Sequence, residues 1–331
     1  MAVFTPVSDA EVAALLAELD VGTLTRLQGI PAGIENSNFF VTTTGRGVGD
    51  AASDTDWVLT LFERLTPQQL PFYLGLMQHL ARHGLPVPAP CATRSGRLLH
   101  QVAGKPAALV QRLPGAHLMA PDLHHCAQLG QVLARMHLAV ADFPLRQANL
   151  RGLDWCVAGA PALLPHLGPA QRALLEDELA FQHQVAASAE HARLPQGAVH
   201  ADLFRDNALF DGLPGHERLT GAIDFYFAGI DSFAYDLAVC LNDWCLAADG
   251  MQLDPARAEA LVAAYQGERP LQGAEQRLLP AMLRRAALRF WVSRLADWHG
   301  PRDAHLLQPK DPAHFERLLT ARRETPWHPP V

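Results

Sequence analysis

The sequence has no excess of positive charge. Among its 331 residues, 27 Lys and Arg stand against 34 Asp and Glu, which gives a net charge of −7. This balance argues against nucleic acid or an anionic membrane as the main partner. No apolar run reaches the ~18 residues that a membrane span needs. The N-terminal stretch lacks a basic segment followed by an apolar one, so we expect no signal peptide.

Cysteine is also scarce, and the five cysteines form no CxxC pair. An odd, scattered set is typical of reduced thiols, which predicts a cytoplasmic protein. There is no fixed-period repeat and no low-complexity tract. Hydrophobic residues make up 49% of the chain and charged residues 18%, as in a globular protein with a sizeable core. The length predicts two domains or lobes.

The pattern of apolar residues changes near Leu113–Gly115. Before this point we expect two helices, at 8–19 and 71–83, and five strands, at 24–27, 38–43, 57–62, 97–101 and 107–111. The polar stretch 45–56 is predicted to connect two of these strands. Afterwards helices dominate, at 122–140, 170–190 and most of 255–299, with brief strands at 207–210 and 219–223. We therefore predict an α+β fold with a small sheet-rich lobe, residues 1–112, and a larger helical lobe, residues 113–331.

The most informative motif is His200-Ala-Asp202-Leu-Phe-Arg-Asp-Asn207, of the form H-x-D-x4-N. Protein kinases use this spacing in their catalytic loop. One carboxylate must orient the attacking hydroxyl and take its proton, and an amide oxygen a short loop away must bind Mg²⁺. We assign the first role to Asp202 and the second to Asn207.

A second acidic residue, Asp224, ends a short apolar strand seventeen residues after Asn207. A hairpin between them would bring the two side chains together, and Asp224 would then be a second Mg²⁺ ligand. Taken singly, an H-x-D pair or an Asp after a strand is more often a turn or cap residue. The combination with a strand, a hairpin and a sheet-rich lobe upstream favours a kinase site.

The segments VHADLFRDNALF (199–210) and AIDFYFAGIDSFAYDLA (222–238) resemble the aminoglycoside phosphotransferase and choline kinase superfamily. The resemblance implies a protein-kinase-like, bilobal fold whose N-terminal lobe holds a small antiparallel sheet and a helix. It also implies that Asp236 begins a helix and braces the catalytic loop, with His200 in a bracing role too. A plain N-cap role for Asp236 is the alternative.

Upstream, the stretch 29–40 resembles the nucleotide-positioning loop of that superfamily. Backbone N–H groups there can approach phosphate oxygens, and GxxxxGK[ST] is absent, which excludes a P-loop. The superfamily has a lysine on the third strand, where this chain has Thr60. Two other basic residues could replace this lysine. Arg64 lies roughly 13 Å from Thr60 along the same strand, and Lys105 is predicted to lie in a loop. The expected ATP-binding residues are Gly33, Asn36, Ser37, Asn38, Val58, Thr60, Gln111 and Leu113, with adenine near 110–113.

Acceptor specificity is expected from the helical lobe. Polar and aromatic residues two turns past Asp236 could line a pocket, and arginines on a later helix could bind a carboxylate in bidentate fashion. Taken singly, each aromatic residue is more simply explained as part of the core, and each arginine as part of a solvent-exposed helix face. The candidate acceptor-binding residues are Asn242, Asp243, Trp244, Arg289 and Arg294.

Within the superfamily, segments such as ENSNFF, WVLTLFE, GLPVPAP and RFWVSRL are similar to the homoserine kinases, over most of the chain. This resemblance implies ATP- and Mg²⁺-dependent phosphorylation of L-homoserine, toward threonine, and makes Thr60 typical of the subgroup. The alternatives are another acceptor (choline, ethanolamine or methylthioribose), a nucleotide-binding pseudokinase favoured by Thr60, and a purely structural protein. The sequence leaves the oligomeric state open.

Overall fold

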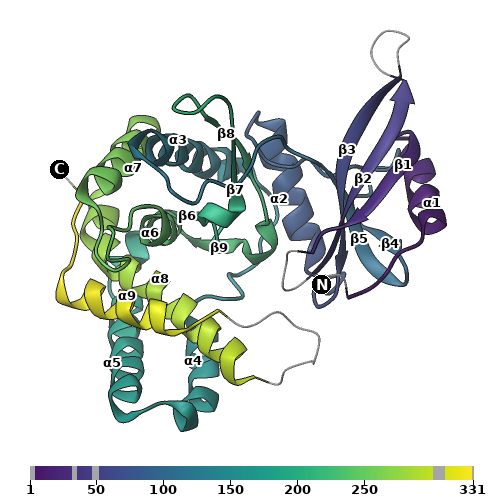
Figure 1. Cartoon of the computed structure of the whole chain (residues 1–331). Helices are drawn as coiled ribbons and strands as arrows, with labels where there is room; N and C mark the ends of the chain where they lie inside the picture. The colour runs from purple at the N-terminus through teal and green to yellow at the C-terminus, as the bar shows by residue number, and fades with distance from the viewer. Residues whose placement is uncertain (1–3, 32–35, 47–51, 301–309, 330–331) are drawn as a thin grey trace. The chain divides into compact units, whose positions relative to one another are not determined.

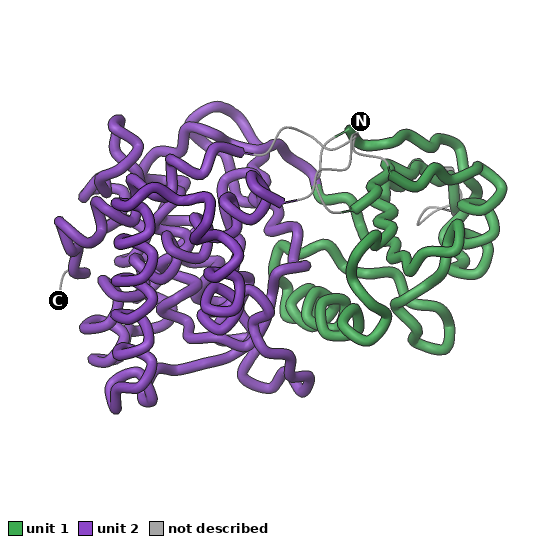
Figure 2. The backbone as a smooth tube through the Cα atoms, turned by 90° about the horizontal axis from the view of Figure 1, so that it is seen from below, with its two compact units in different colours: residues 1–113, 302–308 green, residues 114–301, 309–331 purple. Residues whose placement is uncertain are grey.

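The computed structural model describes residues 4–31, 36–46, 52–300 and 310–329. These residues form two compact units (Figure 2). The described residues up to Leu113 belong to the first unit, and those from Pro114 onward belong to the second.

The first unit is built on a five-stranded antiparallel sheet in the order β1-β2-β3-β5-β4 (Figure 1). Helix α1 begins after Ser8, whose hydroxyl accepts the Glu11 N–H in a capping box. Its apolar face packs on the sheet, where Leu59 and Leu109 are fully buried. The elements are α1 Asp9–Leu19, β1 Thr23–Gly29, β2 Asn36–Arg46, β3 Ala52–Phe62, α2 Leu70–Arg82, β4 His100–Val102 and β5 Lys105–Gln111.

Two expectations for this unit were wrong. Strands β2 and β3 continue into the stretch expected to be a connection, of which 47–51 lie outside the described residues. Polar side chains pair across this ribbon, as in the hydrogen bond from the Thr44 hydroxyl to Asp54, so its strands lack the apolar alternation that marks a half-buried strand. Lys105 lies at the start of β5 rather than in a loop, and its ammonium is 3.0 Å from the Glu63 carboxylate.

The second unit is mainly helical, and α6 lies at its centre in contact with α3, α7, α8, β6 and β9 (Figure 1). Its helices are α3 Leu123–Ala139, α4 Leu153–Leu163, α5 Pro169–Ala186, α6 Phe233–Trp244, α7 Pro255–Glu268, α8 Gly273–His299 and α9 Ala313–Glu324. Two antiparallel pairs join β6 Gln196–Val199 to β9 Gly229–Ser232, and β7 Ala208–Asp211 to β8 Arg218–Ala222. The sequence reasoning missed α4, α9, β6 and β9. Among the described residues, no helix has the length and apolar character needed to cross a membrane.

Helices α3 and α7 cross closely at Gly130. A Cβ atom placed there would lie 2.2 Å from the Leu261 carbonyl oxygen, so only glycine allows the two backbones to approach this far. By contrast, a Cβ atom at Gly159 in α4 would meet no heavy atom within 4 Å.

We expect Gly130→Ala to lower the free energy of unfolding by about 1–3 kcal/mol or more, because the helices must separate. Gly159→Ala is the matched control, and it should leave stability unchanged or raise it by about 0.5–1 kcal/mol. Differential scanning calorimetry of both variants checks this. Equal stability of the two variants would contradict the close crossing.

Candidate active site

The H-x-D-x4-N motif forms the loop between β6 and β7. The amide nitrogen of Asn207 donates to Asp202 twice, to the main-chain oxygen at 2.7 Å and to the carboxylate Oδ2 at 3.1 Å. This orientation leaves the Asn207 carbonyl oxygen Oδ1 for another ligand. The structure therefore brings the predicted base and one predicted metal ligand into direct contact.

Asp224 lies two residues after the end of β8. The N–H of Ile223 donates to the Asn207 carbonyl at 2.9 Å, so the β7–β8 hairpin places Asp224 one residue from that contact. Asp224 adopts φ = 63°, a left-handed conformation that a non-glycine residue rarely takes, and its side chain is exposed. The hairpin expected from the sequence therefore brings two oxygen donors, Asn207 and Asp224, next to each other in the fold.

Electrostatic forces on Asp202 oppose one another. Burial raises the pKa of its carboxyl to about 7, and the negative charges of Asp224 and Asp206 add to this rise. The Arg289 guanidinium, whose Nη1 is 3.7 Å from Oδ1, acts in the opposite direction. The side chain keeps 14% of its surface exposed, so it is accessible to a reactant.

The side chain of Asp236, in α6, binds the backbone of the loop. Its Oδ2 accepts the His200 N–H at 3.0 Å, and its Oδ1 accepts the Ala201 N–H at 2.7 Å. Ala201 has φ = 64°, which is a strained conformation for alanine. Burial by itself would raise the pKa of Asp236, but hydrogen bonds and nearby imidazoles outweigh burial and lower it. Asp236 is not the N-cap, because the α6 cap is Ser232, which accepts the Tyr235 N–H.

His200 links the loop to the strand that leads to Asp224. Its Nε2 is 2.9 Å from the Ile223 carbonyl, to which it donates, and its Nδ1 accepts the Asp202 N–H at 3.3 Å. The ring packs against Phe225. Burial lowers the pKa of His200, which favours the neutral ring that this pattern of one donor and one acceptor requires.

Helix α6 contacts the loop at further positions. The Trp244 indole N–H donates to the Leu203 carbonyl at 3.0 Å, and the Cys240 thiol lies 3.6 Å from the same oxygen. Asp243 accepts hydrogen bonds from the main-chain N–H of Arg205 at 2.7 Å and from its guanidinium at 3.1 Å. Residues spaced three or four apart share a helix face, and this face of α6 meets successive loop residues.

The three acceptor-binding candidates of α6 are therefore engaged inside the protein. Asp243 binds Arg205, as described above, and the Trp244 side chain is fully buried. Asn242 donates to the Leu283 carbonyl at 2.8 Å and accepts from the Arg322 guanidinium at 2.9 Å. Their acceptor-binding role stays a prediction, and the sequence reasoning missed Arg205 as the partner of Asp243.

The arginine candidates lie on α8. Arg289 is 4% exposed, and its Nε has no hydrogen-bond partner in the described part of the chain. Its guanidinium lies over the rings of Phe290, at 3.9 Å, and Phe227, at 5.0 Å. Arg294 is partly buried, which lowers its pKa, whereas the charge of Asp202 acts to raise it. Arg289 thus combines burial next to Asp202 with an unused donor.

The ATP-binding candidates belong to the first unit, apart from Gly33, which lies outside the described residues. Thr60 is buried and donates its hydroxyl to Asn38 at 2.8 Å. Ser37 is buried as well and donates to Glu63 at 2.7 Å. The other candidates lie in or next to strands: Asn36 at the start of β2, Val58 in β3, Gln111 at the end of β5 and Leu113 two residues beyond.

This loop, hairpin and helix arrangement can be compared with known proteins. The family described as "Phosphotransferase enzyme family" matches residues 26–275. The chain belongs to the phosphotransferase enzyme family. It is 52% identical over 330 residues to homoserine kinase of Polaromonas naphthalenivorans (strain CJ2), covering 99% of each chain. It is 53% identical over 326 residues to homoserine kinase of Burkholderia pseudomallei (strain K96243), covering 97% of this chain and 96% of the relative.

Solved structures share the fold of this phosphotransferase. Amicoumacin kinase hAmiN, in complex with AMP-PNP, Ca²⁺ and Ami, matches with a TM-score of 0.69 at 18% identity, covering 96% of this chain and 95% of the other. Plasmodium vivax ethanolamine kinase matches with a TM-score of 0.60 at 13% identity, covering 95% and 86%. The expected protein-kinase-like α+β fold and the assignment as a small-molecule kinase are therefore confirmed.

The raised pKa of Asp202 has a consequence for stability. Because the folded protein binds the proton more tightly than the unfolded chain, whose Asp has a pKa near 3.9, ionising Asp202 costs stability. The cost is absent below about pH 4, grows up to about pH 7 and is full above that. Without metal, Asp202→Asn should therefore be more stable than the wild type at pH 8, by on the order of 2 kcal/mol.

This advantage should shrink steadily as the pH falls from 7 to 5. Urea unfolding followed by circular dichroism in the presence of EDTA measures it, with the exposed Asp211→Asn as the control. A difference between wild type and Asp202→Asn that is independent of pH would contradict the raised pKa.

Proposed function

We propose that the protein transfers the γ-phosphate of ATP to the hydroxyl of L-homoserine, giving O-phospho-L-homoserine on the route to threonine. The observation that carries this proposal is the Asp202 carboxylate, which keeps 14% of its surface exposed and lies between the Asn207 amide and the buried Arg289 guanidinium. Identity above 50% with homoserine kinases over nearly the whole chain supports the choice of acceptor.

Asp202 is the proposed base. Its backbone is fixed by the loop contacts, and its carboxylate is within reach of a reactant because it keeps some exposure. The acceptor oxygen forms a bond to the γ-phosphorus as the bond from that phosphorus to the β,γ-bridging oxygen breaks. ADP leaves, and the hydroxyl proton passes to Asp202. Positioning and charge stabilisation supply most of the rate in this class of reaction.

The donor set of the second unit fits Mg²⁺. Asn207 turns its amide nitrogen toward Asp202, so its Oδ1 is left for a cation, and the exposed carboxylate of Asp224 lies close by in the fold. Amide and carboxylate oxygens are the ligands that Mg²⁺ prefers. Bound there together with phosphate oxygens, Mg²⁺ would neutralise charge on the transferred group.

Arg289 is the proposed partner of the acceptor carboxylate. A buried donor without a partner is costly, and the Arg289 Nε has none among the described residues. The ion pair that Arg289 makes through Nη1 with Asp202 Oδ1 is long, at 3.7 Å. A carboxylate supplied by the substrate would satisfy the Nε donor. Arg294 is the second candidate, because the charge of Asp202 acts on its pKa. Choline and ethanolamine lack this carboxylate, which favours an amino acid as the acceptor.

The first test measures ADP release from Mg·ATP with L-homoserine beside choline, ethanolamine, methylthioribose and serine. We expect turnover with L-homoserine and a loss of at least about 1000-fold in kcat for Asp202→Ala, because an activated hydroxyl and its proton acceptor are lost together. Asn207→Ala and Asp224→Ala should raise the Mg²⁺ concentration needed for half-maximal activity. Asp211→Asn is the control and should behave like wild type.

Preference for another acceptor would overturn the substrate and retain the reaction class. ATP binding without turnover on any acceptor would favour the pseudokinase alternative, with Thr60 in place of lysine as its basis.

A second test compares L-homoserine with 3-aminopropan-1-ol, which lacks only the carboxylate. We expect wild-type kcat/KM to favour homoserine by roughly 10–100-fold, since a hydrogen bond to a charged group contributes ~1.5–3 kcal/mol. Arg289→Gln should bring this ratio close to one. Any effect of the substitution on Asp202 cancels in this ratio, because both acceptors are measured with the same variant.

Arg277→Gln is the matched control for this ratio, since Arg277 is on the same helix but pairs with Glu190 on the surface. A ratio that survives in Arg289→Gln would show that another residue binds the carboxylate.

A further inference from the structure

Three buried donor atoms without an acceptor lie where α6 packs on α8. They are the Tyr235 hydroxyl and the Nε atoms of Arg285 and Arg289, and none has a hydrogen-bond partner among the described residues. The side chains of Tyr235 and Arg289 are almost fully buried, with 1% and 4% of each residue exposed. A buried donor without an acceptor costs free energy, and proteins seldom keep one. Three of them on two neighbouring helices therefore indicate a ligand that supplies the acceptor atoms.

The three side chains are neighbours. The Arg285 guanidinium lies over the Tyr235 ring, with its carbon Cζ 4.7 Å from the ring centre. Arg289 follows one turn later on α8 and on the same helix face. Burial raises the pKa of Tyr235, and among the surrounding charges Arg289 opposes that rise most. The Tyr235 hydroxyl therefore stays protonated and lies in the field of the Arg289 guanidinium.

The carboxylate of Asp231, which lies beside this group, is already engaged at both oxygens. Its Oδ1 accepts from Arg285 Nη1 at 3.1 Å and from the Ser232 N–H at 2.8 Å. Its Oδ2 accepts from Arg285 Nη2 at 2.8 Å and from the Asn149 amide at 2.9 Å. With two donors on each oxygen, Asp231 has no lone pair left for a further donor.

The chemistry of this place favours an anion over a cation as the ligand. The guanidiniums of Arg151 and Arg289 both lie over the Phe227 ring, 5.8 and 5.0 Å from its centre, so several positive charges gather here. A carboxylate can accept from a guanidinium and a hydroxyl at once. The place also borders the proposed base, since Arg289 Nη1 is 3.7 Å from Asp202 Oδ1.

We propose that the Tyr235 hydroxyl donates to the carboxylate of the acceptor beside Arg289, and so helps to select an amino acid over an amino alcohol. Tyr235 is then a specificity-determining residue supplied by α6, one position before the aspartate that binds the active-site loop. The inference rests on the proposed function, because it takes the carboxylate of L-homoserine as the shared ligand of Tyr235 and Arg289.

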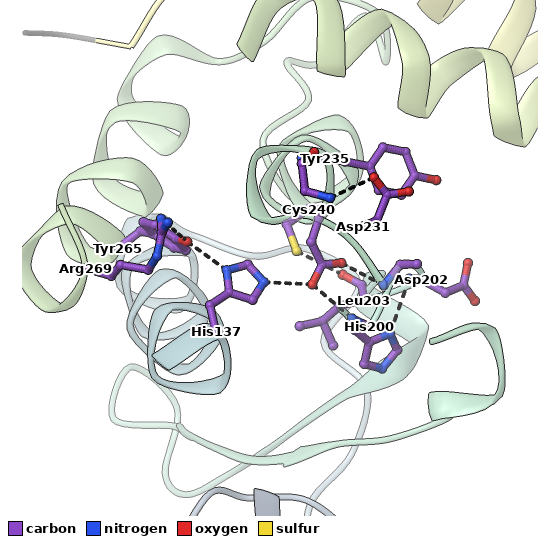
Figure 3. Close-up of polar contacts among 12 residues, drawn as sticks. His137, His200, Asp202, Leu203, Asp231, Tyr235, Cys240, Tyr265 and Arg269 are labelled. Atoms are coloured by element: carbon purple, nitrogen blue, oxygen red, sulfur yellow. Dashed lines mark hydrogen bonds and ion pairs between the residues drawn. The ribbon is translucent and has the colours of Figure 1, made fainter. Parts of the chain in front are cut away.

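Tyr235→Phe removes the hydroxyl and keeps the ring under Arg285. Without substrate, we expect this variant to melt at the wild-type temperature or above, since the lost hydroxyl bonds no described residue. Tyr265→Phe is the matched control, because Tyr265 is also fully buried but its hydroxyl accepts from Arg269 at 3.0 Å and lies 2.7 Å from His137 Nδ1 (Figure 3). It should lower the melting temperature by about 2–4 °C or more. An equal fall in both variants would overturn the proposal, because the Tyr235 hydroxyl would then have a structural partner such as a buried water.

Specificity is measured as the ratio of kcat/KM for L-homoserine to kcat/KM for 3-aminopropan-1-ol. Tyr235→Phe should lower this ratio by roughly 3–10-fold, the size of one hydrogen bond, while kcat/KM for 3-aminopropan-1-ol stays unchanged. Tyr265→Phe should keep the wild-type ratio. In the Arg289→Gln background, Tyr235→Phe should change the ratio by less than about twofold, because residues that bind one group are coupled.

The outcomes separate this inference from the proposed function. If the wild type favours L-homoserine and Tyr235→Phe keeps the wild-type ratio, or loses activity equally on both acceptors, the role of Tyr235 is overturned and the acceptor assignment stands. If the wild type does not phosphorylate L-homoserine, the proposed function fails and the inference fails with it.

Discussion

The structure of the active-site loop depends on one buried carboxylate, Asp236. A charged group without solvent is costly to bury, and here three N–H donors compensate that cost: the backbone of His200 and Ala201, and the ring of His137. In return, the carboxylate fixes a loop whose left-handed alanine would otherwise relax. The position of Asp202 is therefore set by a charge that takes no part in the reaction itself.

Helix α6 extends this control along the loop. From its first turn to its last residue, one helix face meets the loop backbone at 200 and 201, at Leu203 and at Arg205. The β7–β8 hairpin then carries the chain from Asn207 back to Asp224. A helix and a hairpin, each held by local backbone geometry, thus gather the proposed base and the two proposed metal ligands from 23 residues of sequence.

The sequence predicted these features because their chemistry lies in short motifs. The spacing of Asp202 and Asn207 is local, and the hairpin to Asp224 is visible as two apolar runs with a polar connection. Helical periodicity also predicts which residues lie two turns past Asp236, but it carries no information on which segment they contact, so the contacts of Asp243 and Trp244 with the loop were not foreseen. His137 resembled any buried histidine of an apolar helix, because its partners Asp236 and Tyr265 lie 99 and 128 residues away.

The account rests on Asp236 holding the His200 and Ala201 amides, and amide hydrogen exchange tests this most directly. In the wild type, both amides should exchange as slowly as those within α6, since each is buried against a carboxylate oxygen. In Asp236→Asn, one donor would face an amide NH₂, so these two amides should exchange faster while α6 stays protected. Rapid exchange of both amides in the wild type, or unchanged protection in Asp236→Asn, would contradict the account.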